Sequence, residues 1–341
     1  MITEKENLLM AMRGECPERI PTYSIVAKQL PGQPPPSCVV VTPEFLATYR
    51  QYGVGGTDVF GVEYLPTHEA NGAVMPKTWD FLLKDIRNWR DIIKAPDISG
   101  FDWEQIAKKS IEKSNINRAN TALAFDLHFG YFQNLMAFMG FSEGLCALYE
   151  EPEECRALFD YLCGFYCEVA GRIIEYYDPD ILVIKDDTAT AASPFISPDI
   201  YEDLLLPLYD RQIKFGRDRG IPIAFHNCGK CEMFVESMVS IGVNMWDPAQ
   251  PCNDLDGIKA KYANKLVIAG GWQARGRLLD KDVSDDELRE SVRAVVERLA
   301  KGGGYAFMGG FLGPAGDEET LRKNSVIWEM FNDIRYSFYK S

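Results

Sequence analysis

The chain of 341 residues is long enough for one large α/β barrel or for two ordinary domains. Its hydrophobic share of 46% and its charged share of 25% are typical of a soluble globular protein. The formal net charge of −14 disfavours nucleic acid and anionic membranes as partners, because both carry phosphate groups that would repel the protein.

The first residues predict a helix and not a signal peptide. Thr3 and Glu6 have the spacing of a capping box, and Leu8, Leu9 and Met12 form an apolar stripe. The segment lacks the basic and apolar regions of a signal peptide, and no apolar run reaches the roughly 20 residues of a membrane span. The nine cysteines are odd in number and scattered. This pattern favours a reducing cytoplasm over a disulfide framework, so we expect a cytoplasmic protein.

Short apolar and β-branched runs recur along the chain and predict strands. Eight such runs lie at residues 19–25, 57–63, 121–127, 181–187, 221–227, 243–249, 265–271 and 305–311. Amphipathic stretches separate most of them, for example at 197–219 and 284–303. Buried strands that alternate with helices indicate a parallel sheet, and eight such units favour a closed (β/α)8 TIM barrel. We predict one α/β barrel domain over residues 1–341, with the N-terminal helix as an extension.

Three segments depart from this alternation. The stretch LPGQPPPS at 30–37 predicts an extended loop. Residues 63–85 are too polar and turn-rich for a crossover helix, and ANGA at 70–73 is typical of a hairpin turn. We therefore expect a β-ribbon inserted near 64–82. Residues 141–177 predict two helices with a break near EEPEE, and Pro152 is placed to begin the second helix.

In barrels of this class the functional side chains collect at the carboxyl ends of the strands. Here polar residues stand at most of these ends: Tyr23, Glu63, Asp126 with His128, Asp186 with Asp187, His226 with Cys228, Asp247 with Gln250, and Gln273. Polar residues also follow strands because loops are polar, so a single residue of this kind carries little weight. A pair with defined geometry carries more.

His226 and Cys228 form such a pair. The chain has only three histidines, and this one ends an apolar run two residues before a cysteine. Residues i and i+2 of a strand point to the same side, so the imidazole and the thiolate can share one Zn(II) ion. Gly229 then permits a tight turn. Cys231 extends the spacing to H-x-C-x-x-C, but no second ligand pair of a zinc ribbon follows, and we expect Cys231 to point into the packing of the next helix.

Carboxylates supply the candidate catalytic groups. Asp186 and Asp187 close the run ILVIKDD, and we expect one of them to face the barrel axis as a base, a ligand or a hydrogen-bond acceptor. The other is expected to cap the following segment. Asp187 and Glu63 are the candidate catalytic residues. The stretch DLHFG resembles the D-x-H-x-x-G corrinoid motif but is one residue short, so we interpret His128 as a core or rim histidine.

Aromatic residues near the predicted rim either line an aromatic pocket or belong to the core. They are Phe129, Tyr131, Phe132, Trp246 and Trp272.

Five segments of the chain resemble the uroporphyrinogen decarboxylase superfamily, in the same order and over nearly the full length. They are KENLLMAMRGECPERIPTY, ISPDIYEDLLLPLYDRQI, IAFHNCGKCEMFVESMVSIGVNMWDP, VIAGGW and LAKGGGYAF. The resemblance implies a single distorted (β/α)8 barrel and one of two activities. The decarboxylases bind a polycarboxylate through arginines of an N-terminal segment, whereas this chain has no arginine between Arg19 and Arg50. The resemblance therefore favours the other branch, the corrinoid-dependent methyltransferases.

That branch carries H-x-C at the end of the same strand as two zinc ligands, with a further cysteine late in the chain. His226 and Cys228 match the first two ligands. Gly310 and Phe311 stand where the late cysteine would fall, and no cysteine follows Cys252. Either a third ligand comes from Asp187, Cys252 or Glu63, or the protein binds metal weakly or not at all.

The resemblance implies a methyltransferase that moves a methyl group between a small substrate and the cobalt of a corrinoid carried by a separate protein. A changed ligand set fits an ether oxygen that needs a Lewis acid, so an aryl methyl ether is the first expected substrate and a thiol the second. Two alternatives stay open. One is a decarboxylase of a small acid or porphyrinogen, and the other is a non-catalytic binding barrel.

Overall fold

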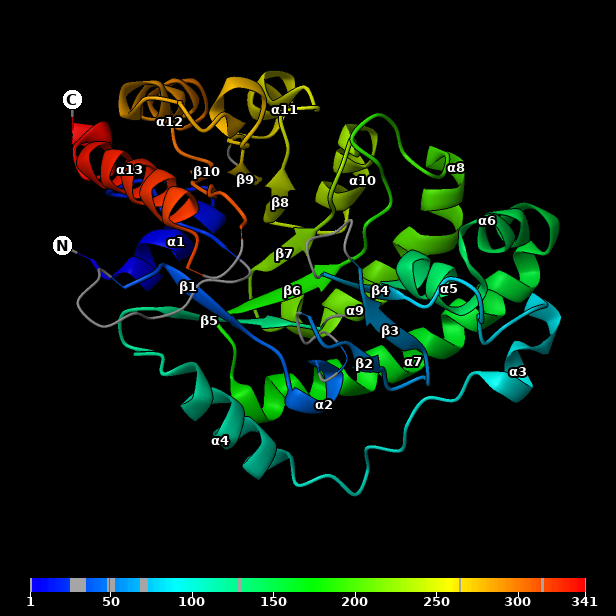
Figure 1. Ribbon diagram of the computed structural model, residues 1–341. Helices are drawn as coiled ribbons and strands as arrows, with labels where there is room; N and C mark the ends of the chain where they lie inside the picture. Colours follow the sequence, from blue (N-terminus) through cyan, green and yellow to red (C-terminus); the bar gives the residue numbers. More distant parts are fainter. Residues whose placement is uncertain are drawn as a thin grey trace.

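A curved sheet of seven parallel strands forms the centre of the computed structural model, which describes residues 2–24, 35–47, 49, 53–67, 73–127, 130–263, 265–313 and 316–340. In spatial order the strands are β1 (Cys38–Val41), β5 (Ala122–Asp126), β6 (Ile181–Lys185), β7 (Ile223–His226), β8 (Met245–Ala249), β9 (Val267–Gly270) and β10 (Tyr305–Ala306). Helices surround this sheet on its outer side (Figure 1).

The segment around Thr22 connects the two edges of the sheet. Thr22 forms a parallel bridge with Phe307, directly after β10, and the backbone N–H of Tyr23 donates to the Phe307 carbonyl at 2.9 Å. On its other side, the Thr22 N–H donates to the Ser37 hydroxyl at 3.0 Å, one residue before β1. The described part of the predicted first strand, around Thr22 and Tyr23, therefore lies in the eighth position, and the (β/α)8 TIM-like fold expected from the alternation is confirmed.

The helices follow the predicted alternation. Their bounds are α1 (Glu4–Met12), α2 (Glu44–Ala47), α3 (Trp89–Ile92), α4 (Trp103–Ser114), α5 (Tyr131–Met139), α6 (Phe141–Glu150), α7 (Pro152–Tyr177), α8 (Pro198–Ile200), α9 (Leu206–Arg217), α10 (Val235–Ser240), α11 (Leu255–Tyr262), α12 (Asp285–Leu299) and α13 (Glu318–Arg335). Pro152 begins α7 as expected, because its missing N–H has no partner within the first helical turn in any case. No helix in the described ranges is long and apolar enough to cross a membrane.

The interior of the barrel is packed with small side chains and is closed at one end by α1. The inward positions of the strands include Ala122, Ala124, Ala224, Ala269 and Ala306, all of them fully buried. Three residues of α1 belong to the same buried cluster: Leu8, Ala11 and Met12. The predicted apolar stripe of α1 therefore seals the amino-terminal end of the barrel, which leaves the carboxyl ends of the strands for a site.

One predicted strand is wrong and one strand was missed. Residues 57–63 do not join the barrel, because the Asp58 carboxylate accepts the N–H groups of Phe60 and Val62 and bends the chain into a turn. The barrel strand in this part of the chain is β1, which pairs with β5 from Cys38 to Val41. Its run of apolar residues is short and directly follows a proline-rich stretch, so periodicity alone did not reveal it.

The inserted β-ribbon is present. Strands β2 (Gly56–Thr57), β3 (Glu63–Pro66) and β4 (Val74–Pro76) form an antiparallel sheet of their own. The predicted turn between β3 and β4 falls mostly on residues 68–72, which lie outside the described residues, but the Thr67 N–H donates to the Ala73 carbonyl at 3.0 Å. In Figure 1 the ribbon lies near the arrowheads of β5 and β6, on the side of the molecule that carries α5.

A buried ion network joins the two ends of the chain. Glu4 of α1 accepts from Arg19 Nε at 2.7 Å and from Arg335 of α13 at 2.6 Å, and both of its side-chain partners are almost fully buried. The Ser37 hydroxyl also donates to Glu4, at 3.0 Å. Arg19 is therefore engaged with α1 and is not free to bind a substrate.

Replacing Glu4 with glutamine is expected to lower the free energy of unfolding by about 3 kcal/mol, because two buried guanidinium groups would lose their counter-charge. Glu6→Gln on the same helix is the matched control, since Glu6 pairs with Arg13 on the surface, where each side chain is nearly half exposed. Chemical denaturation of both variants measures the difference. Equal losses of stability would show that the buried network does not stabilise the fold beyond a surface pair.

Candidate active site

Three adjacent strands bring charged and polar side chains to the same level of the barrel. Lys185 of β6 is the register partner of His226 of β7, which is in turn the partner of Asp247 of β8. Register partners on parallel strands project to the same face of the sheet. All three residues are at least nine-tenths buried, so this layer lies within the barrel at the carboxyl ends of the strands.

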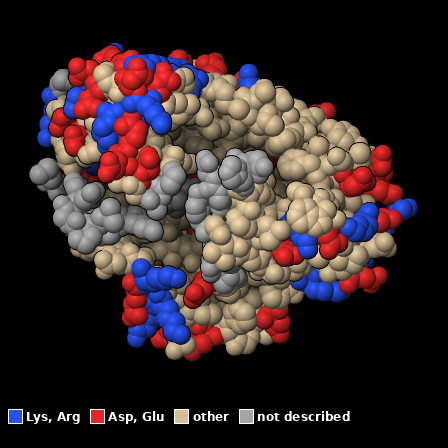
Figure 2. Space-filling model, in the orientation of Figure 1, with Lys and Arg blue, Asp and Glu red and all other residues tan. Residues whose placement is uncertain are grey.

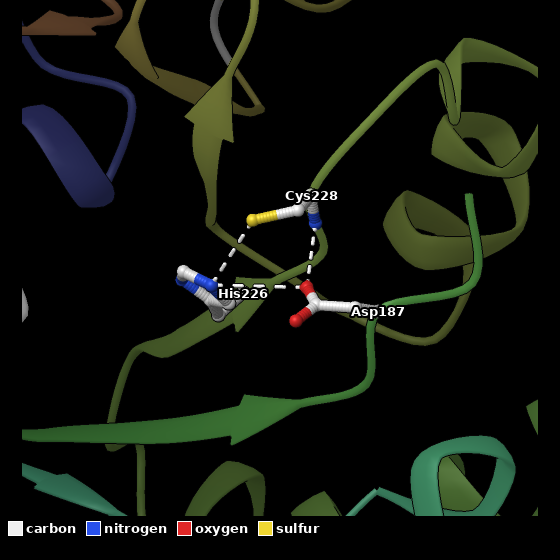
Figure 3. A group of neighbouring side chains, drawn as sticks. All are labelled: Asp187, His226 and Cys228. Carbon is white, nitrogen blue, oxygen red and sulfur yellow. Dashed lines mark hydrogen bonds and ion pairs between the residues drawn. The ribbon is translucent and has the colours of Figure 1, made fainter. Parts of the chain in front are cut away.

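Asp187, His226 and Cys228 come together at this end of the barrel. One ligand atom from each of them lies within 4.8 Å of the others. Cys228 Sγ is 3.4 Å from His226 Nε2, and Asp187 Oδ1 is 3.8 Å from the same nitrogen. Figure 3 shows the three side chains pointing toward one another from the ends of β6 and β7. Because one sulfur, one nitrogen and one oxygen converge, the group has the donor types of a zinc site.

Asp247 orients the imidazole of His226. Its Oδ2 lies 2.6 Å from His226 Nδ1, and the Asp247 side chain is fully buried. A carboxylate can only accept, so Nδ1 carries the proton and Nε2 presents its lone pair toward Asp187 and Cys228. This carboxylate–histidine arrangement is typical of metal ligands. Asp247 Oδ1 and the Tyr23 hydroxyl are buried without a hydrogen-bond partner in the described part of the chain, so the surroundings of this carboxylate are incompletely satisfied.

The loop after β7 is held tightly against the loop after β6. Asn227 points away from His226, as its position in the strand predicts, and its amide exchanges hydrogen bonds with Thr188. Gly229 has a φ of +94°, and a Cβ there would lie 2.6 Å from the carbonyl oxygens of Ala189 and Thr190. Glycine is therefore required at this position, and the tight turn expected after Cys228 is present.

Asp186 and Asp187 have different roles. Asp186 is buried, accepts from the N–H groups of Phe132 and Gln133 at the start of α5, and accepts from the Tyr209 hydroxyl at 2.7 Å. Burial raises the pKa of Asp186 to about 6. A Cβ on Gly130 would lie 2.4 Å from Asp186 Oδ1, so glycine is needed there. Asp186 thus caps α5, which precedes it in the chain, and not the following segment as expected, and it does so in the interior and not on the surface.

Asp187 is positioned by two hydrogen bonds. Its Oδ1 accepts from the N–H of Cys228 at 2.8 Å, and its Oδ2 accepts from Gln133 Nε2 at 2.9 Å. The first bond joins the two neighbouring loops, and the second joins Asp187 to α5. Since the carboxylate is fixed from both sides, Oδ1 stays directed at His226 and Cys228.

The Cys228 thiol is in an environment that opposes its ionisation in the absence of a cation. Burial raises its pKa well above the usual range, and the charge of Asp187 raises that pKa further. A divalent cation between Cys228, Asp187 and His226 would offset both effects, because metal coordination favours the thiolate. The residues present therefore fit a metal such as Zn(II), with Asp187 as the third ligand.

An apolar pocket of about 610 Å³ adjoins this group. Its wall is formed mainly by the ribbon and by α5, and it is largely aromatic and aliphatic: Tyr64, Val74, Met75, Pro76, Phe81, Phe132, Met136, Phe141 and Phe195. Phe132 and Phe195 stack with their ring planes 19° apart. Asp187 is the only charged residue among those that line the pocket in the described ranges. In Figure 2 the described side chains beside the hollow near the middle of the face are mostly uncharged, whereas charged side chains gather over α12 and α13 at the upper left.

Several residues singled out in the sequence lie away from the group. Glu63 is on the exposed ribbon and pairs with Lys77 at 2.8 Å. Cys231 is fully buried, lies outside the group as expected, and donates to the Asn227 carbonyl. Cys252 is half-buried beside Asn253 and also lies outside the group. His128 falls outside the described residues.

Of the four aromatic residues considered in the sequence that the structure describes, only Phe132 lines the pocket. Tyr131, Trp246 and Trp272 are buried in the core, and Phe129 falls outside the described residues.

Sequence reasoning missed three residues of this site. Asp247 was named as a polar residue at a strand end, but its contact with His226 was not predicted, because that contact depends on the register of β7 and β8. Gln133 lies on α5, more than fifty positions before the carboxylate that it binds. Lys185 was overlooked although it stands two positions before Asp187, a spacing that places alternate strand residues on one side.

Comparisons with known proteins agree with this fold. The sequence model of the uroporphyrinogen decarboxylase (URO-D) family matches residues 129–316, more than half of the chain. A solved structure described as a methyltransferase from Methanosarcina mazei is similar with a TM-score of 0.62 and 13% sequence identity, over 99% of this chain and 100% of that one. A mutant methylaspartate ammonia lyase from Clostridium tetanomorphum matches with a TM-score of 0.32 and 12% identity, over 70% of this chain and 48% of that one. No curated protein matches the sequence.

Proposed function

This chain belongs to the uroporphyrinogen decarboxylase family, and from that premise we propose that it is a methyltransferase whose site is the group Asp187, His226 and Cys228. The convergence of these three ligand atoms beside an apolar pocket supports the proposal most directly. The similarity in fold to a protein described as a methyltransferase also supports it. We propose an aryl methyl ether as the methyl donor and a corrinoid carried by a separate protein as the acceptor.

The pocket favours an uncharged aromatic donor over a porphyrinogen. A substrate with many carboxylates needs guanidinium or ammonium partners, and the described lining residues offer neither. Arg19 is committed to Glu4. Aromatic walls such as Phe132 and Phe195 suit a planar ring, because ring stacking adds roughly 0.5–1.5 kcal/mol beyond simple burial.

The residues of the site have separate tasks in this proposal. His226, Cys228 and Asp187 hold a metal, and Asp247 fixes the orientation of the His226 ring. The pocket holds the ring of the donor so that its methoxy oxygen lies at Asp187. A bound Zn(II) ion would supply Lewis acidity toward that oxygen. The methyl carbon faces the open end of the barrel, where the corrinoid of the partner can approach it. Positioning of this kind converts an encounter into an intramolecular reaction.

The proposed function is tested by metal analysis and turnover of the purified protein. We expect about one zinc per chain, and methyl transfer from aryl methyl ethers to cob(I)alamin or to a reduced corrinoid protein. Parallel assays with thiol acceptors, and assays for CO2 release from small acids and porphyrinogens, cover the other activities. If the protein methylates thiols and does not demethylate aryl ethers, its substrate is a thiol and not an ether. CO2 release without methyl transfer would contradict the proposal.

A further inference from the structure

Lys185 is a largely buried cation that has no partner among the described residues. It ends β6, only 8% of its surface is exposed, and it projects into the barrel at the level of His226 and Asp247. Its register partner His226 lies two residues before Cys228. No hydrogen bond or ion pair of the Lys185 ammonium occurs within the described ranges, although three ammonium protons are available as donors.

Another buried lysine of the chain shows what a structural role looks like. Lys323 of α13 is 4% exposed, and its Nζ donates to three backbone carbonyls, those of Leu278, Leu279 and Asp280. It also pairs with Glu319 at 3.5 Å. Lys323 thus satisfies its donors by tying α13 to a loop. The Lys185 ammonium makes no such bond to another described segment, so a structural role does not account for its burial.

The Lys185 side chain is largely buried, but its Nζ is not among the unpartnered polar atoms that are sealed from solvent, so the ammonium opens into accessible space. Holding a cation in a largely buried position without a counter-charge is costly. At the carboxyl ends of the strands, the hydrogen-bond donors of this ammonium can find their acceptor on an entering ligand. Oδ2 of the neighbouring Asp247 is bonded to His226, and its Oδ1 makes no hydrogen bond to Lys185 or to any other described residue. Both oxygens of Asp187 are bonded to Cys228 and Gln133. The unfilled donors of Lys185 are therefore open to an incoming acceptor that carries negative charge.

We propose that the Lys185 ammonium is the binding site for the oxygen of the methyl donor as that oxygen becomes an anion. This inference rests on the proposed function. When the bond between the methyl carbon and the oxygen breaks, its electron pair stays on the oxygen, and the methyl carbon is taken by the reduced corrinoid, which supplies the pair of the new bond. The oxygen gains charge as the reaction proceeds. A preorganised ammonium in a largely buried site stabilises this charge more than it stabilises the neutral ether.

The apolar pocket and Lys185 lie on different sides of Asp187, so the ring and the oxygen of a substrate can occupy different parts of the site. The apolar pocket lies on the side of Asp187 that faces α5 and the ribbon. Lys185 lies on the inner side, within the barrel. A ring held in the pocket therefore directs its oxygen inward, toward Lys185. Since the pocket itself has no cation among its described lining residues, Lys185 is the side chain that would favour a phenolate over its methyl ether, in addition to any metal held by the group.

Ligand binding tests the inference without turnover. The probes are 4-nitrophenolate and its methyl ether, 4-nitroanisole, titrated into the purified protein at a pH where the phenol is ionised. Lys185→Met removes the charge and keeps the length of the side chain. We expect the variant to lose about 10- to 100-fold in affinity for the phenolate, the effect of one hydrogen bond to a charged group. Its affinity for 4-nitroanisole should stay near the wild-type value.

Two controls make the result specific. Lys230→Met removes an ammonium that is 42% exposed on the loop after β7 and should leave both affinities unchanged. The melting temperature of Lys185→Met should equal or exceed that of the wild type, because an unpaired buried charge has been removed. An unchanged phenolate affinity, an equal loss for the ether, or a lower melting temperature would overturn the assignment. So would an equal loss of affinity for 4-methoxybenzoate, since Lys185 would then bind a ring carboxylate.

Turnover separates the failure of this inference from the failure of the proposed function. If the wild type demethylates a series of aryl methyl ethers, the loss caused by Lys185→Met should grow as the leaving phenolate becomes more basic. The zinc content of the variant should stay at the wild-type level. Equal losses across the series would contradict the role of Lys185 and leave the methyltransferase intact. Absence of turnover in the wild type would contradict the proposed function itself.

Discussion

Cys228→Ala is expected to abolish methyl transfer, with a loss of more than about 100-fold. Outer partners of metal ligands already contribute 10- to 100-fold in affinity or activity, and a direct ligand contributes more. Cys228 Sγ faces His226 Nε2 at 3.4 Å, so its removal leaves two of the three convergent ligand atoms. Turnover with aryl methyl ethers and zinc analysis of the purified variant measure the loss.

The fold should survive this change. The hydrogen bond that joins this loop to Asp187 is made by the Cys228 backbone N–H, which the alanine variant keeps. Cys231→Ala is the matched control, because this thiol is three positions away, fully buried and outside the group. It should keep its zinc and a turnover near the wild-type rate. Added zinc should raise the melting temperature of the wild type and of Cys231→Ala, but not that of Cys228→Ala. Full activity in Cys228→Ala would show that His226 and Cys228 have no catalytic role.

Asp187→Asn is expected to lower metal affinity by at least about 10- to 100-fold and to lower turnover with it. An asparagine keeps the shape of the side chain and one acceptor for the Cys228 N–H, while Gln133 can turn its amide to accept from the new side chain. The loops should therefore stay in place while the negative charge is lost. Because the defect lies in binding, an excess of zinc should restore part of the activity. Metal titration and turnover at low and high zinc measure the effect.

Two further variants assign the third ligand. Asp178→Asn makes the same chemical change on a side chain that is 93% exposed and should have no effect on metal binding. Cys252→Ala tests the other residue that the sequence left open as a ligand. Normal zinc binding by Asp187→Asn, together with a loss of zinc binding by Cys252→Ala, would show that Cys252 and not Asp187 is the third metal ligand. Glu63 has a partner in Lys77 on the exposed ribbon, and we assign it no part in the site.

Local patterns predicted a large part of this protein. Alternation of apolar runs with amphipathic helices predicts the barrel, because buried parallel strands and their covering helices have different periods. The proline at the start of α7 and the polar, turn-rich ribbon act within a few residues, so both were visible in the sequence. The spacing of His226 and Cys228 also predicts their proximity, since alternate residues at a strand end project to one side.

Tertiary structure decided which other side chains join that pair. Neighbouring aspartates in ILVIKDD have the same chemistry, and only the position of α5 makes Asp186 a buried cap and Asp187 a member of the group. The register of β6, β7 and β8 sets Lys185 and Asp247 on either side of His226. Such contacts join segments that are 21 to 54 positions apart in the chain. Local periodicity carries no information about them, because they depend on how separate strands and helices pack against one another.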